Sequence, residues 1–103
     1  MIDFTTFKGL YGEAKEATSE ERYIVNRGWQ EWMAETNGAV DILHKIYAVV
    51  KNGFKALLPE YKNLKSLCEY LALPYGTAQK WKNDVCSPPE YVLMQLLYAT
   101  INR

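Results

Sequence analysis

The sequence predicts an all-α protein of five to six helices, and two observations lead to that prediction. Apolar residues recur at spacings of three and four along most of the 103 residues, which is the period of a helix buried on one face. No segment alternates apolar and polar residues with a period of two, so we expect no sheet. The six glycines and four prolines fall mainly at the ends of the periodic segments, where they would separate helices.

The first two predicted helices occupy residues 4–17 and 18–37. The first has an apolar stripe at helical spacing, formed by Phe4, Phe7, Tyr11 and Ala14. The Thr-Ser-Glu-Glu sequence of residues 18–21 matches a capping box and begins the second helix, which Asn37-Gly38 ends. The buried face of this second helix would consist of Val25, Trp29, Trp32 and Met33.

Residues 39–58 predict a third and longer helix. Its apolar stripe consists of Leu43, Ile46, Val50, Phe54 and Leu57. Gly53 lies within this stripe, so we expect it to bend or divide the helix. Pro59 marks the end, because proline disfavours a helical conformation at the residue before it.

Three shorter helices follow in the remaining sequence. Asn63 caps the first of them, a tight turn at residues 73–75 ends it, and residues 77–83 form the second. The Ser-Pro-Pro-Glu sequence of residues 87–90 predicts the start of the last helix, with the serine as its cap and proline in its first turn. The inner faces of the first two short helices would consist of Leu64, Leu67, Cys68, Leu71, Ala78 and Trp81.

The charges divide the chain near residue 50. Residues 1–50 carry five basic and eight acidic side chains, a net charge of −3, whereas residues 51–103 carry seven basic and four acidic side chains, a net charge of +3. We therefore predict an N-terminal helical extension over residues 1–50 that packs on or dimerises the rest. Residues 51–103 form a second domain with the sign expected of a nucleic-acid-binding face.

Composition argues against several functional classes. The N-terminus has neither a basic start nor a long apolar run, so we expect no signal peptide and no membrane anchor. Cys68 and Cys86 lie 18 positions apart in a chain with one histidine, which predicts reduced cytoplasmic thiols, no metal site and no cofactor. No nucleophile with a base, pair of catalytic carboxylates or phosphate-binding loop is evident, so we do not expect an enzyme.

The region around residues 64–83 has the spacing of a helix-turn-helix. Two short helices are separated by three or four residues and are followed by a further helix. The first helix would brace the second, since the small Ala78 allows the two axes to approach and Trp81 fills the space beneath. The outward-facing residues of the second helix would then be Tyr75, Gly76, Gln79, Lys80 and Asn83.

The sequence LCEYLALPYGTAQKWKN at residues 67–83, followed by SPPEYVL at residues 87–93, resembles the Xre or lambda-repressor-like helix-turn-helix family. It is most similar to the small members found in Gram-positive bacteria and their mobile elements, in which an I-P-x-R-T-x-Q-x-W recognition helix is followed by P-P-x-Y-V-L. The resemblance covers roughly residues 54–98. The residues that carry it are Pro74, Thr77, Gln79, Trp81, Pro88, Pro89, Tyr91 and Val92.

This resemblance implies a recognition helix in the major groove of double-stranded DNA. Gln79 and Lys80 would lie near base edges, and Thr77 with Lys82 near phosphates. These roles suit the side chains, since glutamine pairs with adenine and lysine donates to guanine. The full set of DNA-binding residues that we expect is Tyr75, Gly76, Thr77, Gln79, Lys80, Lys82 and Asn83.

Two positions depart from the family pattern. Gly76 stands where the family usually has arginine, and Asp84 begins a run, Asp-Val-Cys-Ser, where the family tends to have glycine and then a basic residue. Two cationic contacts are therefore missing and one acid is added, which would weaken the salt-dependent part of DNA binding.

Two functions follow from these observations. The first is a sequence-specific double-stranded DNA-binding transcriptional regulator of a bacterial mobile element or phage, cytoplasmic and associated with the nucleoid when bound. It would act as a homodimer through its final helix or its N-terminal helices, because one small domain makes few base contacts. The alternative is a phage-encoded, protein-binding inhibitor of a host defence complex that keeps the fold and has lost most of its DNA affinity.

Overall fold

The computed structural model describes residues 2–34, 36 and 38–103, and within them the protein is all-α, with no strand. Its elements in chain order are α1 (Phe4–Glu16), α2 (Glu20–Ile24), the 3-10 segment η1 (Val25–Arg27), α3 (Glu31–Ala34), α4 (Ala39–Asn52), the 3-10 segment η2 (Gly53–Glu60), α5 (Leu64–Leu71), α6 (Tyr75–Lys82) and α7 (Glu90–Ile101). The predicted fold class is confirmed. The described residues contain seven α-helices rather than five or six. The additional helix arises because the single helix predicted over residues 18–37 is divided into α2 and α3.

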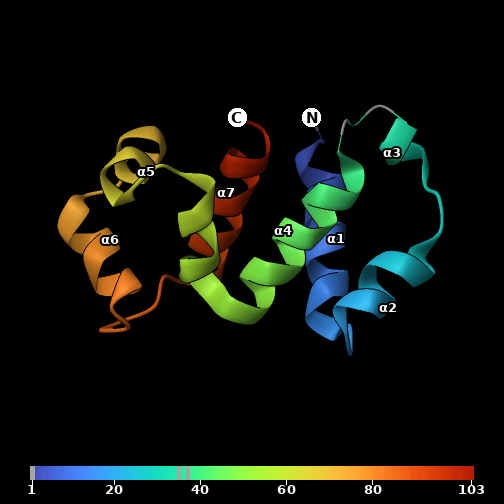
Figure 1. Cartoon of the computed structure of the whole chain (residues 1–103), viewed down its shortest axis with the longest axis horizontal. Helices are drawn as coiled ribbons and strands as arrows, with labels where there is room; N and C mark the ends of the chain where they lie inside the picture. The colour runs from blue at the N-terminus through green and yellow to red at the C-terminus, as the bar shows by residue number, and fades with distance from the viewer. Residues whose placement is uncertain (1, 35, 37) are drawn as a thin grey trace.

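The helices are arranged along an axis 41 Å long (Figure 1). The α5–α6 pair lies at one end of this axis, and α2 and α3 lie at the other. Between them, α4 packs against α1 and α7, and η2 packs against α6 and α7. The molecule therefore presents two well-separated ends, each built from short helices.

One apolar core extends through both halves of the sequence. It includes residues of α1, α4, η2, α5 and α7, and residue 50 itself lies within α4. The largest side chains that are completely buried are Phe7, Leu43, Ile46, Val49, Leu57, Leu67 and Leu97. Most of them occupy positions that the helical periodicity assigns to the inner faces.

The first and last segments of the chain contact each other through hydrogen bonds and aromatic packing. The backbone N–H of Ile2 donates to Asn102 Oδ1 at 3.2 Å, and Asn102 Nδ2 donates to the Ile2 carbonyl at 3.2 Å. The Tyr98 hydroxyl donates to the same carbonyl at 3.0 Å, and its ring meets Phe4 edge-on at 5.2 Å. These contacts join α7, which follows the α5–α6 pair in sequence, to α1 at the opposite end of the chain.

Side-chain caps set the start of three helices. Asp3 accepts from the N–H of Thr6 at 2.7 Å and begins α1, which ends at Glu16 as the sequence predicts. Asn63 accepts from the N–H of Ser66 at 2.8 Å, so its predicted capping of α5 is confirmed. A cap of this kind satisfies an N–H that has no partner within the helix, typically at a gain of about 1 kcal/mol.

The predicted helix over residues 18–37 is wrong beyond its first turns. Ser19 caps α2, but the regular helix ends at Ile24, and Gly28 adopts a positive φ of 73° that L-residues rarely adopt. The chain therefore changes direction at Gly28. Two of the residues expected inside, Val25 and Trp29, are exposed, whereas Trp32 and Met33 pack partly on the core.

The predicted end of this helix at Asn37-Gly38 lies partly outside the described residues, because Asn37 is not among them. Gly38 has a φ of 70° and immediately precedes α4. The next expectation is confirmed: Gly53, with a φ of 75°, divides the third predicted helix into α4 and η2. The second part extends to Glu60, so Pro59 lies just inside its end.

The start predicted for the last helix is wrong by two residues. Ser87 does not cap α7, which begins at Glu90 after Pro89 in an extended conformation with a ψ of 149°. A proline disfavours the α conformation at the residue before it, so Pro89 keeps Pro88 out of the helix. The helix begins only after the second proline.

Candidate functional site

The α5–α6 pair is formed by two eight-residue helices joined by a tight turn. Ala72 ends α5 in a left-handed conformation with a φ of 56°, and the N–H of Leu73 donates to the Cys68 carbonyl at 3.0 Å. Pro74 is extended, and its carbonyl accepts from the N–H of Ala78 at 3.1 Å, which begins α6. The helix thus starts two residues earlier than the sequence predicts.

Ala72 provides a test of this turn, because a left-handed conformation costs an L-residue about 1–2 kcal/mol and glycine much less. We expect Ala72→Gly to raise the free energy of unfolding by up to about 1 kcal/mol. The matched control is Ala48→Gly in the interior of α4, which should lower it by about 1 kcal/mol. Urea denaturation measures both, and a loss of stability in both variants would contradict the observed turn.

The inner face of α6 fixes this helix on the rest of the protein. Ala78 is completely buried, which allows close approach to α5 and η2. Trp81 is half-buried, and its ring meets that of Phe54 edge-on at a centroid distance of 5.3 Å. The predicted inward direction of both residues is confirmed. Burial also raises the pKa of the Cys68 thiol, consistent with its expected place in the core.

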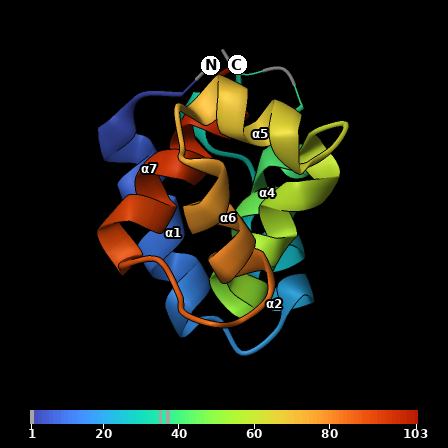
Figure 2. The same cartoon turned by 90° about the vertical axis from the view of Figure 1, so that its left-hand side faces the viewer.

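The outer face of α6 is open to solvent, and none of the other described helices lies over it (Figure 2). Thr77 is half-buried at the flank of the helix. The other residues predicted for the site are exposed: Tyr75, Gly76, Gln79, Lys80, Lys82 and Asn83. The α6 sequence, YGTAQKWK, contains two lysines and no acidic residue, so this face is polar and positively charged.

An ion pair lies at the turn that follows α6, between Asp84 of this turn and Lys55 of η2. Asp84 has a φ of 61°, and the N–H of Val85 donates to the Lys80 carbonyl at 2.9 Å, which closes the end of the helix. Lys55 Nζ of η2 lies 2.5 Å from Asp84 Oδ2. The acid that interrupts the basic face is therefore paired with a lysine 29 residues away, which no local pattern in the sequence indicates.

The described residues carry no sign of a metal site or a membrane span. No group of three or more histidine, cysteine, aspartate or glutamate side chains among them could hold a metal ion. No helix in this part of the chain is both long and apolar enough to cross a bilayer.

No protein-family model, curated protein or solved structure matches this chain.

Proposed function

We propose that the chain is a sequence-specific double-stranded DNA-binding transcriptional regulator of a bacterial mobile element or phage, cytoplasmic and associated with the nucleoid when bound. In this proposal α5 and α6 form a helix-turn-helix of the Xre or lambda-repressor-like family, and α6 enters the major groove. The observation that supports it is the exposed outer face of α6, which carries the amide of Gln79 and the ammonium group of Lys80. The inner face of the same helix packs on the core through Ala78 and Trp81. A protruding helix of this kind suits the width of the major groove.

The shape of the molecule restricts how a dimer would read DNA. Half-sites lie about 34–36 Å apart, centre to centre, on one face of the duplex. The α2 and α3 helices lie at the end opposite α6, so a dimer joined end to end there would separate the two α6 helices by more than one molecular length of 41 Å (Figure 1). We therefore propose that the homodimer forms through α7, whose first turn exposes Tyr91.

Alanine substitutions on α6 test the proposal. A preferred duplex is first selected from a random pool, and binding is then measured by fluorescence anisotropy at two salt concentrations. Gln79→Ala and Lys80→Ala should each weaken binding to this duplex by about tenfold, as expected for base-edge contacts. Lys82→Ala should weaken binding to all sequences alike and reduce the salt slope by about 0.9.

Lys8→Ala is the matched control, since Lys8 is an exposed lysine on α1. It should leave both the affinity and the salt slope unchanged. If no duplex binds even at low salt, or if all three α6 variants bind like the parent protein, the DNA-binding proposal is wrong.

A second candidate is a phage-encoded inhibitor that binds a host defence complex, keeps the fold and has lost most of its DNA affinity. Val25 and Trp29, 67% and 71% exposed, favour it, because an exposed tryptophan is a frequent anchor of protein interfaces. The segment that carries them connects α2 and α3, in the half of the chain with a net charge of −3. Absence of DNA binding at low salt would favour this candidate over the first.

A further inference from the structure

Two exposed apolar side chains lie at the end of the molecule formed by α2 and α3: Val25 is 67% exposed and Trp29 is 71% exposed. The segment that carries Trp29 connects η1 to α3 and runs along the edge farthest from α5 and α6 (Figure 1). Glu21 lies one helical turn before Val25, whose N–H donates to the Glu21 carbonyl, so these two side chains share one face. We call Glu21, Val25 and Trp29 the tryptophan surface.

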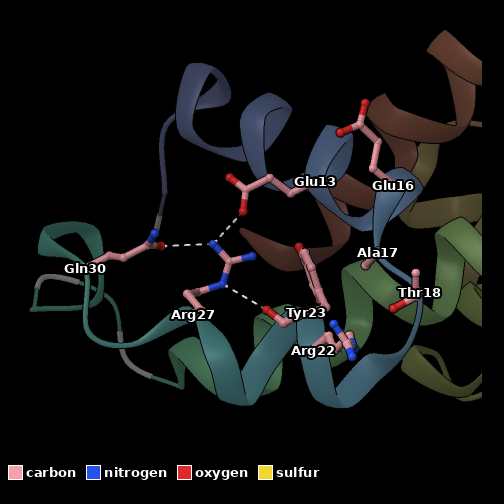
Figure 3. Close-up of a pocket in the computed structure, with 8 residues that line it drawn as sticks. All are labelled: Glu13, Glu16, Ala17, Thr18, Arg22, Tyr23, Arg27 and Gln30. Atoms are coloured by element: carbon pink, nitrogen blue, oxygen red, sulfur yellow. Dashed lines mark hydrogen bonds and ion pairs between the residues drawn. The ribbon is translucent and has the colours of Figure 1, made fainter.

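The backbone on both sides of Trp29 is held in place by Arg27, whose side chain is 4% exposed. Arg27 Nε donates to the Tyr23 carbonyl at 3.2 Å, and Nη1 donates to Gln30 Oε1 at 3.1 Å (Figure 3). The same Nη1 lies 2.7 Å from Glu13 Oε1, which joins the segment to α1. A surface that is already ordered loses little conformational entropy when a partner binds. An exposed tryptophan on such a backbone is suited to anchor an interface.

A groove of about 590 Å³ lies at the opposite end of the molecule, which Figure 2 views directly. It follows one face of α5 and continues along the turn into α6, where Tyr75 is the first helical residue. Its surface is mainly apolar, and its volume is within the range of about 300–1,000 Å³ for sites that accept drug-sized groups. The groove therefore has room for an indole ring. Its lining residues are Lys65, Cys68, Glu69, Ala72, Leu73 and Tyr75.

The two ends of the molecule carry opposite charges. Over residues 13–34, three acidic side chains and one basic side chain form no ion pair within the described residues, a net charge of −2: Glu16, Glu21, Glu31 and Arg22. Over residues 61–84, four basic side chains and one acidic side chain form none, a net charge of +3: Lys62, Lys65, Lys80, Lys82 and Glu69. The ends of two copies therefore attract each other, and a net charge of zero for the whole chain adds no repulsion between copies.

The tryptophan surface and the groove complement each other but cannot meet within one molecule, because they lie at opposite ends of its 41 Å axis (Figure 1). We propose that the chain associates with a second copy of itself head to tail, with the Trp29 indole of one copy bound in the groove of the next. The acidic surroundings of Trp29 then face the lysines around the groove. Because the two contacting surfaces differ, each added copy leaves one of each free, and the assembly continues to grow.

This contact differs from the homodimer through α7, which would use the same surface on both copies and close at two. It is also independent of the DNA-binding proposal, because it is measured on the protein alone. Tyr75 both lines the groove and belongs to the outer face of α6, so a copy bound there would cover part of this face. Competition between self-association and DNA is the one consequence that rests on the proposed function.

Sedimentation of the full chain, freed of nucleic acid, over a range of protein concentrations tests the proposal. At low salt we expect the weight-average mass to rise beyond two copies as the concentration increases. At about 1 M salt the Debye length falls to about 3 Å, so the attraction between the charged ends is screened. We expect the association to be at least about tenfold weaker there, as for a contact guided by complementary charge.

One variant on each surface locates the contact. Trp29→Ala should weaken association by at least about 30-fold, the loss expected at an aromatic anchor. Lys65→Glu should weaken it by at least about tenfold, because it reverses a charge beside the groove. Both residues are exposed, so the fold should persist, which circular dichroism checks. An equimolar mixture of the two variants should associate more tightly than either alone, because each supplies the surface that the other lacks.

Two controls match these variants. Val85 is 71% exposed, like Trp29, but it belongs to neither surface. Lys8 is an exposed lysine of α1 that lies outside the groove. Val85→Ala and Lys8→Glu should therefore associate like the parent protein, and losses equal to those of Trp29→Ala and Lys65→Glu would contradict the proposed contact.

A mass that stays at one copy or stops at two over the whole concentration range at low salt would overturn the proposal. The tryptophan surface would then be left to a different protein partner. The proposal is also wrong if Trp29→Ala or Lys65→Glu associates like the parent protein, or if their mixture associates no better than its components.

Discussion

Trp81→Ala is expected to lower the free energy of unfolding by about 3 kcal/mol, the lower end of the range for large aromatic truncations. The ring is half-buried and meets Phe54 edge-on, so its loss leaves a cavity between α6 and η2. It also removes one of the two inner-face side chains, with Ala78, that hold α6 on the rest of the protein. Urea denaturation followed by circular dichroism measures the change.

Trp29→Ala is the matched control for this experiment. Trp29 is 71% exposed, so its removal should change the free energy of unfolding by less than about 0.5 kcal/mol. Equal losses in the two variants would contradict the burial that distinguishes them. A loss confined to Trp29→Ala would mean that α6 does not pack on Phe54.

The α5–α6 pair was predictable because local signals agree there. Asn63 caps α5, Pro74 fixes the turn, and Leu67 and Ala78 are both completely buried, as helical spacing predicts. Each signal acts within a few residues along the chain. A pattern in which local preferences and core packing point to one structure is readable from sequence.

Residues 25–29 were not predictable, because tertiary contacts override the apolar spacing there. Val25 and Trp29 follow the spacing of an inner face, yet both are exposed. Gly28 reverses the chain, and the Arg27 side chain binds Glu13 of α1 at 2.7 Å. That contact joins segments 14 residues apart, so it does not appear in any window of helical periodicity.

The ion pair between Lys55 and Asp84 could not be predicted from the sequence either, because it joins residues that lie 29 positions apart in the chain. The sequence predicts Asp84 as an acid at the edge of a basic face, but not that a lysine of η2 reaches it. The candidate site therefore includes one residue, Lys55, that only the fold brings to α6. The left-handed conformation of Asp84 is also explained by the fold, since it closes the end of the helix.

The double variant Gly76→Arg, Asp84→Asn is expected to bind DNA about 60-fold more tightly than the parent protein at about 0.1 M salt. Each added phosphate contact contributes about eightfold there, from a slope of about −0.9 per contact. A Cβ at Gly76 meets nothing within 4 Å, so the arginine has room on the open face of α6. Asparagine tolerates the left-handed conformation at residue 84 and leaves Lys55 free for a second phosphate.

Two matched variants separate these effects from simple changes in net charge. Gly76→Gln adds a long polar side chain without a charge, and Asp41→Asn removes an acid that is paired with Lys45 within α4. Neither control should raise the salt slope, whereas the double variant should raise it by about 1.8. Anisotropy titrations at two salt concentrations provide both quantities. If the double variant binds no better than Asp41→Asn, the outer face of α6 does not approach the phosphates, and the DNA-binding proposal would have to be abandoned.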